Sequence, residues 1–334
     1  MQIAYSLRMN TTQHPTPDEL TLVELTGRFP DEATALAYFE TLRWPNGVRC
    51  VHCDNADAAK LYKRTQNKKS KVRAGLWECG VCGEQFRCTI GTIFEDSHVP
   101  MHKWLIAWYL ICGAKKGMSA LQLKRHLFGD KGSYKTAWFM AHRIRHAMAE
   151  PIFAEKLSGT VEIDETYVGG KTRIEFKNGK MTTALDNKTP VVSLVERGGT
   201  KRSVVMPRVN SANLRAAIVE HTAENTRTMT DDSRLYFRLG EVREHHPVNH
   251  SKKQYALKKA GFTAHTNTVE SSFSLIKRSI IGSFHHVSKK HLGRYLAEAD
   301  FKWNHRTVSD GARTVKGLCK TVGKRLTYKP LTQK

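Results

Sequence analysis

Residues 161–171 read VEIDETYVGGK, and this stretch decides the fold that the sequence predicts. Apolar and polar residues alternate in it, so Val161 and Ile163 are expected on one face of a strand and Glu162, Asp164 and Thr166 on the other. Two further strands are predicted over 189–199 and 201–209, then a helix over 213–224 and a fourth strand over 226–232. The region therefore predicts a sheet whose polar face carries acids.

The chain as a whole is strongly basic. Its 334 residues include 54 Lys or Arg against 31 Asp or Glu, a net charge of +23, and the last 90 residues alone hold 18 Lys or Arg and four Asp or Glu. A charge of this size predicts a polyanionic partner, and nucleic acid is the first candidate. A solvated basic tail is the alternative that charge alone leaves open. The most apolar run, 104–112, is too short to span a bilayer, and no amino-terminal signal is visible.

Four cysteines have the spacing of a metal site. Cys50 and Cys53 form one C-x-x-C pair, Cys79 and Cys82 form another, and 25 residues lie between the pairs. Each pair lets two thiolates converge on one ion, so the four predict one structural, tetrahedral Zn²⁺ site. Four unrelated buried thiols are the alternative. The intervening basic segment, 60–73, is expected to form an exposed hairpin tip that binds DNA through Lys63, Arg64, Lys68 and Lys69.

Three helical segments follow Pro100, and Ser119 and Ser133 suit the N-caps of the last two. The arrangement resembles a helix-turn-helix, in which the final helix enters the major groove. The residues of that helix expected to face DNA are Lys135, His142, Arg143 and Arg145, and those expected to be buried are Trp138, Phe139, Ala141 and Ile144. A plain three-helix bundle would give the same pattern, but the basic charge favours DNA binding.

Three acids are candidates for a second metal site. Asp164 lies within the first strand and Asp231 ends the fourth, so both can project from one sheet edge. Residues 262–282 predict a long helix, with Glu270 on its polar face and Val269, Phe273, Ile276 and Ile280 on its apolar face. Three gathered carboxylates repel one another unless cations neutralise them. Two Mg²⁺ ions would do so and would support phosphoryl transfer.

Each acid has a competing interpretation. Glu165 is the alternative to Asp164, and Asp232 is the alternative to Asp231. Glu270 could instead complete a capping box in which Asn267 is the N-cap. These alternatives remain open from the residues alone.

Several motifs together resemble the ISXO-like group of bacterial insertion-sequence transposases, which are related to the Merlin transposons. They are DETYVGGK at 164–171, TDD at 230–232, KGMSALQL at 116–123, SYKTAW at 133–138 and the long block that begins HTNTVESSF at 265. The resemblance covers nearly the whole chain and implies a DDE-type transposase. It implies that Asp164, Asp231 and Glu270 bind two Mg²⁺ or Mn²⁺ ions, with Lys277 as the accompanying base. Some members have Asn as the third residue, so Asn267 remains an alternative to Glu270.

The predicted fold class is α+β or α/β: a ribonuclease H-like mixed sheet with helices, preceded by a zinc ribbon and a helix-turn-helix-like region. The predicted domains are an amino-terminal helical segment (1–45), the zinc ribbon (46–92), the helical DNA-binding region (98–150), the catalytic domain (157–310) and a basic tail (311–334). We expect Lys277 and Arg278 to contact double-stranded DNA.

The predicted function is that of a transposase that cleaves and joins DNA. Its expected partners are the terminal repeats and target DNA, bound by a homodimer or larger assembly in the cytoplasm, at the nucleoid. The alternatives are a DNA-binding regulator without catalysis and a structure-selective nuclease on the same fold.

Overall fold

The computed structural model describes residues 20–65, 72–150, 155–170, 173–177, 180–184, 188–249, 256–259 and 261–332. The chain divides into two compact units. Unit 1 contains the chain up to Cys88, residues 99–109 and residues 307–319, and unit 2 contains residues 89–98, 110–306 and the chain from Lys320 onward. The predicted boundary between 150 and 157 therefore lies inside unit 2.

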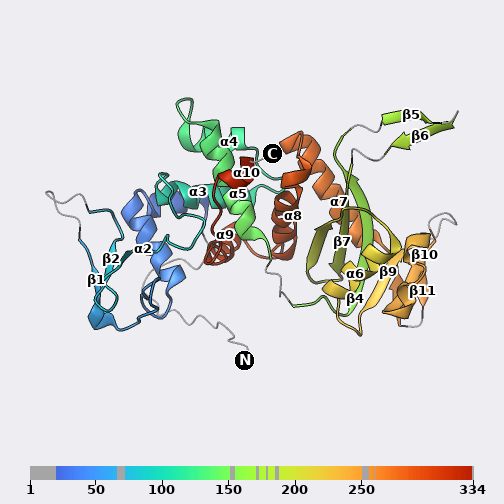
Figure 1. Ribbon diagram of the computed structural model, residues 1–334, viewed down its shortest axis with the longest axis horizontal. Helices are drawn as coiled ribbons and strands as arrows, with labels where there is room; N and C mark the ends of the chain where they lie inside the picture. Colours follow the sequence, from blue (N-terminus) through green and yellow to red (C-terminus); the bar gives the residue numbers. More distant parts are fainter. Residues whose placement is uncertain are drawn as a thin grey trace. The chain divides into compact units, whose positions relative to one another are not determined.

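Unit 1 combines a small antiparallel sheet with helices (Figure 1). The sheet has the order β1-β2-β3, with β1 at Leu61–Lys63, β2 at Trp77–Cys79 and β3 at Gln85–Phe86, and a 3-10 helix, η2, at Ala58–Lys60. Helix α1 (Leu22–Arg28) begins at a capping box, and α2 (Glu32–Arg43) begins at the N-cap Asp31. Helix α2 packs against α9 (Asp310–Cys319).

Two contacts fix the elements of unit 1. The buried Glu40 of α2 accepts hydrogen bonds from Trp77 Nε1 at 3.0 Å and from Lys63 Nζ at 2.9 Å, so the helix holds β1 and β2. Helix α3 (Met101–Gly113) contributes the buried Trp108, and a Cβ on Gly317 of α9 would lie 2.3 Å from its ring. The close approach of α9 to this ring therefore requires glycine.

Unit 2 is built on a five-stranded mixed sheet of order β10-β9-β4-β7-β8. The strands are β4 (Thr160–Val168), β7 (Thr189–Glu196), β8 (Lys201–Val205), β9 (Arg227–Asp231) and β10 (Glu244–Val248). Strand β7 is antiparallel to β4 and β8, whereas β9 is parallel to both β4 and β10. The sheet has the ribonuclease H-like topology that the sequence predicts.

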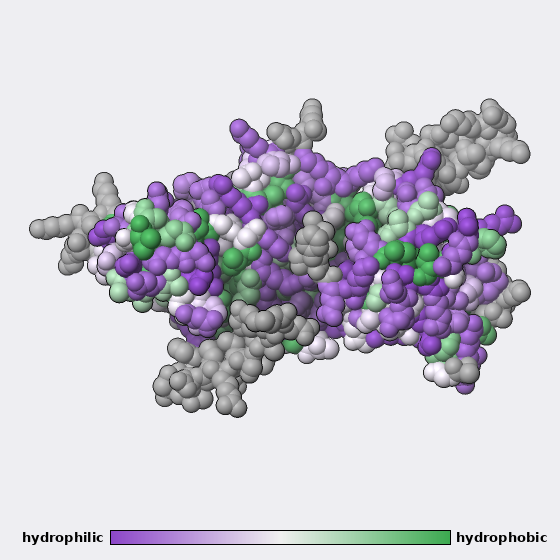
Figure 2. All heavy atoms as spheres, turned by 60° about the horizontal axis from the view of Figure 1, so that its bottom comes forward, coloured by the Kyte–Doolittle hydropathy of each residue, from purple (hydrophilic) through white to green (hydrophobic). Residues whose placement is uncertain are grey.

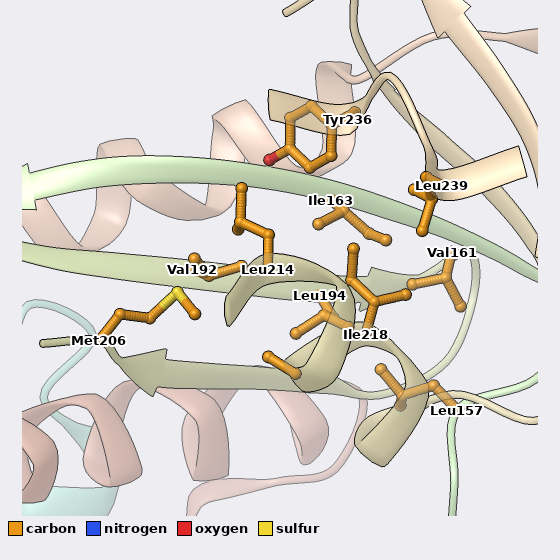
Figure 3. Close-up of a cluster of buried hydrophobic side chains, with 11 residues drawn as sticks. Leu157, Val161, Ile163, Val192, Leu194, Met206, Leu214, Ile218, Tyr236 and Leu239 are labelled. Carbon is orange, nitrogen blue, oxygen red and sulfur yellow. The ribbon is translucent and has the colours of Figure 1, made fainter. Parts of the chain in front are cut away.

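Helices cover both faces of this sheet (Figure 1). Val161 and Ile163 face α6 (Ser211–His221), in a core that also contains Leu194, Leu214 and Ile218 (Figure 3). The opposite face packs against α7 (Asn267–Ser279) and α8 (Lys289–Asn304), in a core whose members include Val168, Val191, Phe273, Leu292 and Leu296. The alternation predicted for 161–166 is confirmed, because the two cores take alternate residues of β4.

The remaining elements are short. Hairpin β5–β6 (Arg173–Lys177 and Lys180–Ala184) lies between β4 and β7 in the sequence, and hairpin β11–β12 (Leu257–Lys259 and Phe262–Ala264) precedes α7. Two 3-10 turns, η3 (Arg234–Tyr236) and η4 (Leu239–Glu241), follow β9. A π-helical turn, η6 (Ile280–Phe284), follows α7, and α10 spans Lys329–Thr332.

The single helix predicted over 262–282 is wrong at its start, and its last turn has a different helical type. Residues 262–264 form β12 instead, because they pair with β11 and Ala264 is buried in a small core with Met229 and Val248. The helical hydrogen bonding starts only at Asn267, and from Ile280 the turn widens to a π-helix.

In the helix predicted to enter the DNA groove, four residues were expected to be exposed, and this expectation is wrong for three of them. These residues form α5 (Tyr134–Met148), which packs against α4 (Ala120–Phe128) and α8 within unit 2. His142, Arg143 and Arg145 are buried, and only Lys135 is exposed. A helix covered by neighbours on two sides buries charged positions that an amphipathic pattern alone places in water.

Two of these buried residues, Arg145 and Arg143, have hydrogen-bond partners inside the protein. Arg145 donates to Glu298 Oε2 of α8 at 2.6 Å and to the Met118 carbonyl at 3.3 Å. Arg143 donates to the Leu326 carbonyl at 3.2 Å. Burial is the main cause that lowers the pKa of His142 to about 2, so its ring is neutral.

The surface of the described residues is largely hydrophilic on the face drawn in Figure 2, where hydrophobic residues gather in small patches. Among these residues, no helix combines the length and the apolar character needed to cross a membrane.

Candidate functional site

The four predicted zinc ligands come together in unit 1. The Sγ atoms of Cys50 and Cys82 lie 3.7 Å apart and those of Cys53 and Cys79 lie 3.6 Å apart. All four Sγ atoms lie within 4.8 Å of one another. A tetrahedral Zn²⁺ with Zn–S bonds of about 2.3 Å requires sulfur atoms about 3.8 Å apart. The cysteines therefore fit one structural Zn²⁺ ion.

Two turns of the same construction position these thiols. In each turn the first cysteine, Cys50 or Cys79, accepts at its carbonyl from the backbone N–H four residues later, at 3.0 Å and 2.8 Å. Those later residues are Asp54 and Gly83, and both have a positive φ. Hydrogen bonds from backbone N–H groups, first of all that of Cys82, lower the pKa of Cys79 to about 6, whereas burial and the neighbouring thiols raise the pKa values of Cys53 and Cys82.

The basic residues between the cysteine pairs lie only partly within the described chain. Lys68 and Lys69 lie outside it. Lys63 is ion-paired with Glu40 at 2.9 Å, and Arg64 is ion-paired with Glu78. Both basic side chains are about half exposed, so a partner could still reach them.

In unit 2, two of the three predicted acids lie on neighbouring parallel strands, and the third lies on the helix that packs against one face of the sheet. Strands β4 and β9 are parallel and pair as far as Glu162 beside Met229, and Asp164 and Asp231 each lie two residues beyond that pair. Side chains two residues apart on a strand share a face, so Asp164 and Asp231 both lie on the side that α7 covers. Glu270 lies in the first turn of α7.

The pKa of Asp164 is shifted by the charges of the nearby acids. Burial is the first cause that raises the pKa of Asp164 to about 7, and the negative charges of Glu165, Asp231 and Glu270 raise it further. A backbone hydrogen bond from Glu165 N–H at 2.8 Å opposes them. Asp231 itself accepts from the Ser233 N–H at 3.2 Å. The acids thus share one electrostatic environment.

The acids are less closely gathered than the cysteines. Within the described ranges, the cysteines are the only group of three or more Cys, His, Asp or Glu whose ligand atoms all lie within 4.8 Å of one another. The competing residues have other hydrogen-bond partners, although the charge of Glu165 also acts on Asp164. Glu165 accepts a short hydrogen bond from the hydroxyl of Tyr236, which belongs to the core against α6. Asp232 is exposed and accepts from Asn249 at 2.7 Å.

The start of α7 differs from the predicted capping box. Its N-cap is Thr266, and Asn267 is the first helical residue and is exposed. Glu270 Oε1 accepts from the hydroxyl of Thr266 at 2.7 Å. The backbone N–H groups of Thr268 and Val269 are instead satisfied by Glu162 of β4, at 2.7 Å and 3.1 Å.

The two faces predicted for this helix are confirmed. The exposed residues include Asn267, Glu270, Ser274 and Lys277, and the buried residues include Val269, Phe273 and Ile276. Lys277 and its neighbour Arg278 are both exposed.

Sequence reasoning missed Glu162, Arg197 and Tyr236. Glu162 is fully buried and pairs with Arg197, and Tyr236 is buried beside Glu165. The sequence carries one signal for Glu162: it is an acid between two apolar residues of a predicted strand. A carboxylate buried at such a position requires a polar or charged partner.

Comparisons with known proteins match both units. Residues 156–304 match an ISXO2-like transposase domain, and residues 30–85 match a transposase zinc-ribbon domain. The chain is also 29% identical over 290 residues to an uncharacterized protein in transposable element ISH50 of Halobacterium salinarum, a match that covers 80% of this chain and 89% of that protein. With a zinc-ribbon match ahead of a transposase-domain match, the chain is similar to ISXO2-like insertion-sequence transposases.

Proposed function

We propose that this chain is a DDE-type transposase that cleaves DNA at the ends of an insertion sequence and joins the freed ends to target DNA. The observation that supports this most is that the negative charges of Asp231 and Glu270 act on Asp164, which lies on the central strand of a ribonuclease H-like sheet. The three acids come from two strands and a helix, so the fold rather than the local sequence gathers them.

The side chains present fit divalent ions of the Mg²⁺ or Mn²⁺ type. Carboxylate oxygens are the ligands that such ions prefer, and the repulsion that raises the pKa of Asp164 is relieved by a cation. Asp164, Asp231 and Glu270 would hold two ions, with Asn267 as the alternative to Glu270. When bound, the ions supply activation of the attacking oxygen and stabilisation of the leaving oxygen.

The proposed reaction has two steps. In the first, a water oxygen attacks the phosphorus at the element end, the bond from phosphorus to the 3′ oxygen breaks, and that oxygen leaves as a hydroxyl. In the second, the freed 3′ hydroxyl attacks a target phosphorus, loses its proton and displaces a target 3′ hydroxyl. Each step exchanges one phosphorus–oxygen bond for another, so the chain's main task is to position DNA.

Exposed basic residues provide for that positioning. Lys277 lies on the same face of α7 as Glu270 and, with Arg278, is placed to hold a phosphate near the acids. Lys135 of α5 and the ribbon residues Lys63, Arg64, Lys68 and Lys69 are further proposed contacts to double-stranded DNA. Because two element ends must be joined to one target, we propose a homodimer or larger assembly on DNA. We place it in the cytoplasm, at the nucleoid.

The test uses purified protein, DNA carrying the element's two ends, a target plasmid and Mg²⁺. Asp164→Asn and Asp231→Asn should leave end binding unchanged and lower cleavage about 100-fold or more, because each removes a charge that would hold the ions. Asp232→Asn is the matched control, since Asp232 is exposed and bonded to Asn249, and it should stay within about threefold of the wild type.

The products separate the alternative functions. Joined products identify a transposase, cuts without joining identify a structure-selective nuclease, and binding without cuts identifies a regulator. Full cleavage by Asp164→Asn or Asp231→Asn would contradict the site assignment.

A further inference from the structure

One buried acid in unit 2 has no part in the proposed chemistry, although it lies two residues from Asp164. Glu162 is 0% exposed. Its Oε1 accepts from Arg197 Nε at 2.7 Å and from the Thr268 hydroxyl at 2.9 Å, and its Oε2 accepts from the backbone N–H groups of Thr268 and Val269. A carboxylate is buried at this cost only when such partners replace its water.

These partners make Glu162 the cap of α7. The N-cap residue Thr266 makes no side-chain cap bond, and the first N–H groups of any helix have no partner within the helix. Glu162 supplies that partner from another element of the fold, and its negative charge suits the positive end of the helix dipole.

Arg197 extends the attachment to the chain that leads into α7. Besides Glu162, its guanidinium donates to the carbonyl of Thr263 at 2.7 Å and to that of His265 at 3.1 Å. Arg197 directly follows β7, so this one side chain ties β4, β7 and the entry to α7 together.

The attachment of α7 to β4 also determines where Glu270 lies relative to Asp164. Glu162 and Asp164 share one strand and one face, about 6.6 Å apart along it. Glu270 follows the capped residue Val269 directly, about 1.5 Å further along the helix axis. A shift of the first turn of α7 along β4 therefore displaces Glu270 relative to Asp164 by the same amount.

We propose that Glu162, held by Arg197, is a positioning residue that fixes the first turn of α7 to β4 and thereby sets Glu270 against Asp164. The inference rests on the proposed function, in which those two acids hold divalent ions. The alternative is that the buried pair only stabilises the fold.

A second buried acid in the same unit provides the control for that alternative. Asp300 of α8 accepts from the backbone N–H of Ser203 at 2.6 Å and pairs with the buried Lys201 at 3.5 Å. It therefore joins a helix to the sheet by the same kinds of contact as Glu162, but at β8, the far edge from β9. Glu162→Gln and Asp300→Asn each remove one buried charge and should both lower the melting temperature.

Binding of Mn²⁺ to the zinc-loaded full-length chain, measured by calorimetry without DNA, distinguishes the two roles. Asp164→Asn provides the blank for Mn²⁺ bound elsewhere. We expect Glu162→Gln to weaken the Asp164-dependent binding about tenfold or more, as loss of a group that orients ligands does, and Asp300→Asn to change it less than about twofold. The Mg²⁺ concentration for half-maximal end cleavage should rise in parallel.

Glu162→Asp covers the case in which Glu162→Gln does not fold. It keeps the charge beside Arg197 but is one methylene short of the Thr268 and Val269 N–H groups, so it should fold and still weaken Mn²⁺ binding. Wild-type affinity in these Glu162 variants, or an equal loss in Asp300→Asn, would overturn the inference and leave the proposed function intact. No Asp164-dependent Mn²⁺ binding by the wild type would overturn both.

Discussion

The cysteine cluster of unit 1 and the acid cluster of unit 2 are assembled by different means. Each cysteine pair sits in one turn of five residues with its own backbone hydrogen bonds, and the four sulfur atoms already lie at metal-ligand spacing. The acids come from β4, β9 and α7, and their spacing depends on strand register and on how α7 is attached. Local sequence thus builds the first site, and tertiary packing builds the second.

The largest effect should come from loss of the zinc ion. Cys79→Ser removes a buried ligand at the end of β2, and binding of structural zinc contributes about 10 kcal/mol or more to folding of such modules. We expect the ribbon to lose its zinc and become sensitive to proteases, while the sheet of unit 2 stays folded. Zinc content and limited proteolysis measure the two results.

The matched control for this variant is Cys88→Ala. Cys88 is equally buried in unit 1 but lies outside the cluster, so the variant should keep its zinc and lose about 1 kcal/mol. A Cys79→Ser chain with an intact ribbon would mean that packing, rather than the ion, holds the ribbon together.

The next largest effect should come from the buried ion pair between α5 and α8. Arg145→Met leaves Glu298 without one of its two basic partners, the other being Lys302, and should lower the free energy of unfolding by about 3–5 kcal/mol. Denaturant unfolding measures this. Below the melting temperature, DNA binding should be unchanged because the Arg145 side chain is only 1% exposed.

Lys135→Met on the same helix is the counterpart of this variant. Lys135 is exposed, so its loss should leave stability within about 0.5 kcal/mol. If Arg145→Met lowered the free energy of DNA binding by as much as the free energy of unfolding, α5 would be a recognition helix.

Much of the fold was predictable from the sequence because its signals are local. Alternation over 161–166 gives the two faces of β4, and the C-x-x-C spacing gives the cysteine cluster. The polar and apolar faces of α7 follow in the same way from residues three and four apart.

The errors arise where distant residues decide the structure. Residues 262–264 form a strand because Ala264 packs against Met229 and Val248, and Arg145 is buried because α8 supplies Glu298. Neither partner is visible in the local pattern. For the same reason the sequence could nominate Glu270 but not Glu162, whose helix partners are more than a hundred residues away.

Glu270 and Asn267 both lie in the first turn of α7, and either is a candidate for the third metal ligand beside Asp164 and Asp231. The negative charge of Glu270 acts on Asp164, and a carboxylate is a better ligand for Mg²⁺ than the uncharged amide of Asn267. We expect Glu270→Gln to lower cleavage about 100-fold and Asn267→Ala to lower it less than about threefold. Rates of end cleavage at saturating Mg²⁺ measure both. The reverse order would assign the role to Asn267.

The smallest effect should come from the exposed ion pairs of the ribbon. Arg64→Met breaks the pair with Glu78, but the Arg64 side chain is 50% exposed, so the loss of stability should stay below about 1 kcal/mol. Lys63→Met should cost more than Arg64→Met, because the partner of Lys63, Glu40, is buried and would lose its charge partner. Thermal unfolding of the zinc-loaded chain ranks the two variants.

Arg64→Met and Glu78→Gln test the proposed DNA contact of the ribbon. A lysine or arginine that neutralises one phosphate changes the salt dependence of binding by about one ion, uniformly across DNA sequences. Because Glu78 and Glu40 already hold these cations, DNA must compete with an internal partner, and Glu78→Gln should therefore strengthen end binding while Arg64→Met weakens it. Equal affinity of both variants and the wild type across a salt titration would place the DNA contact elsewhere on unit 1.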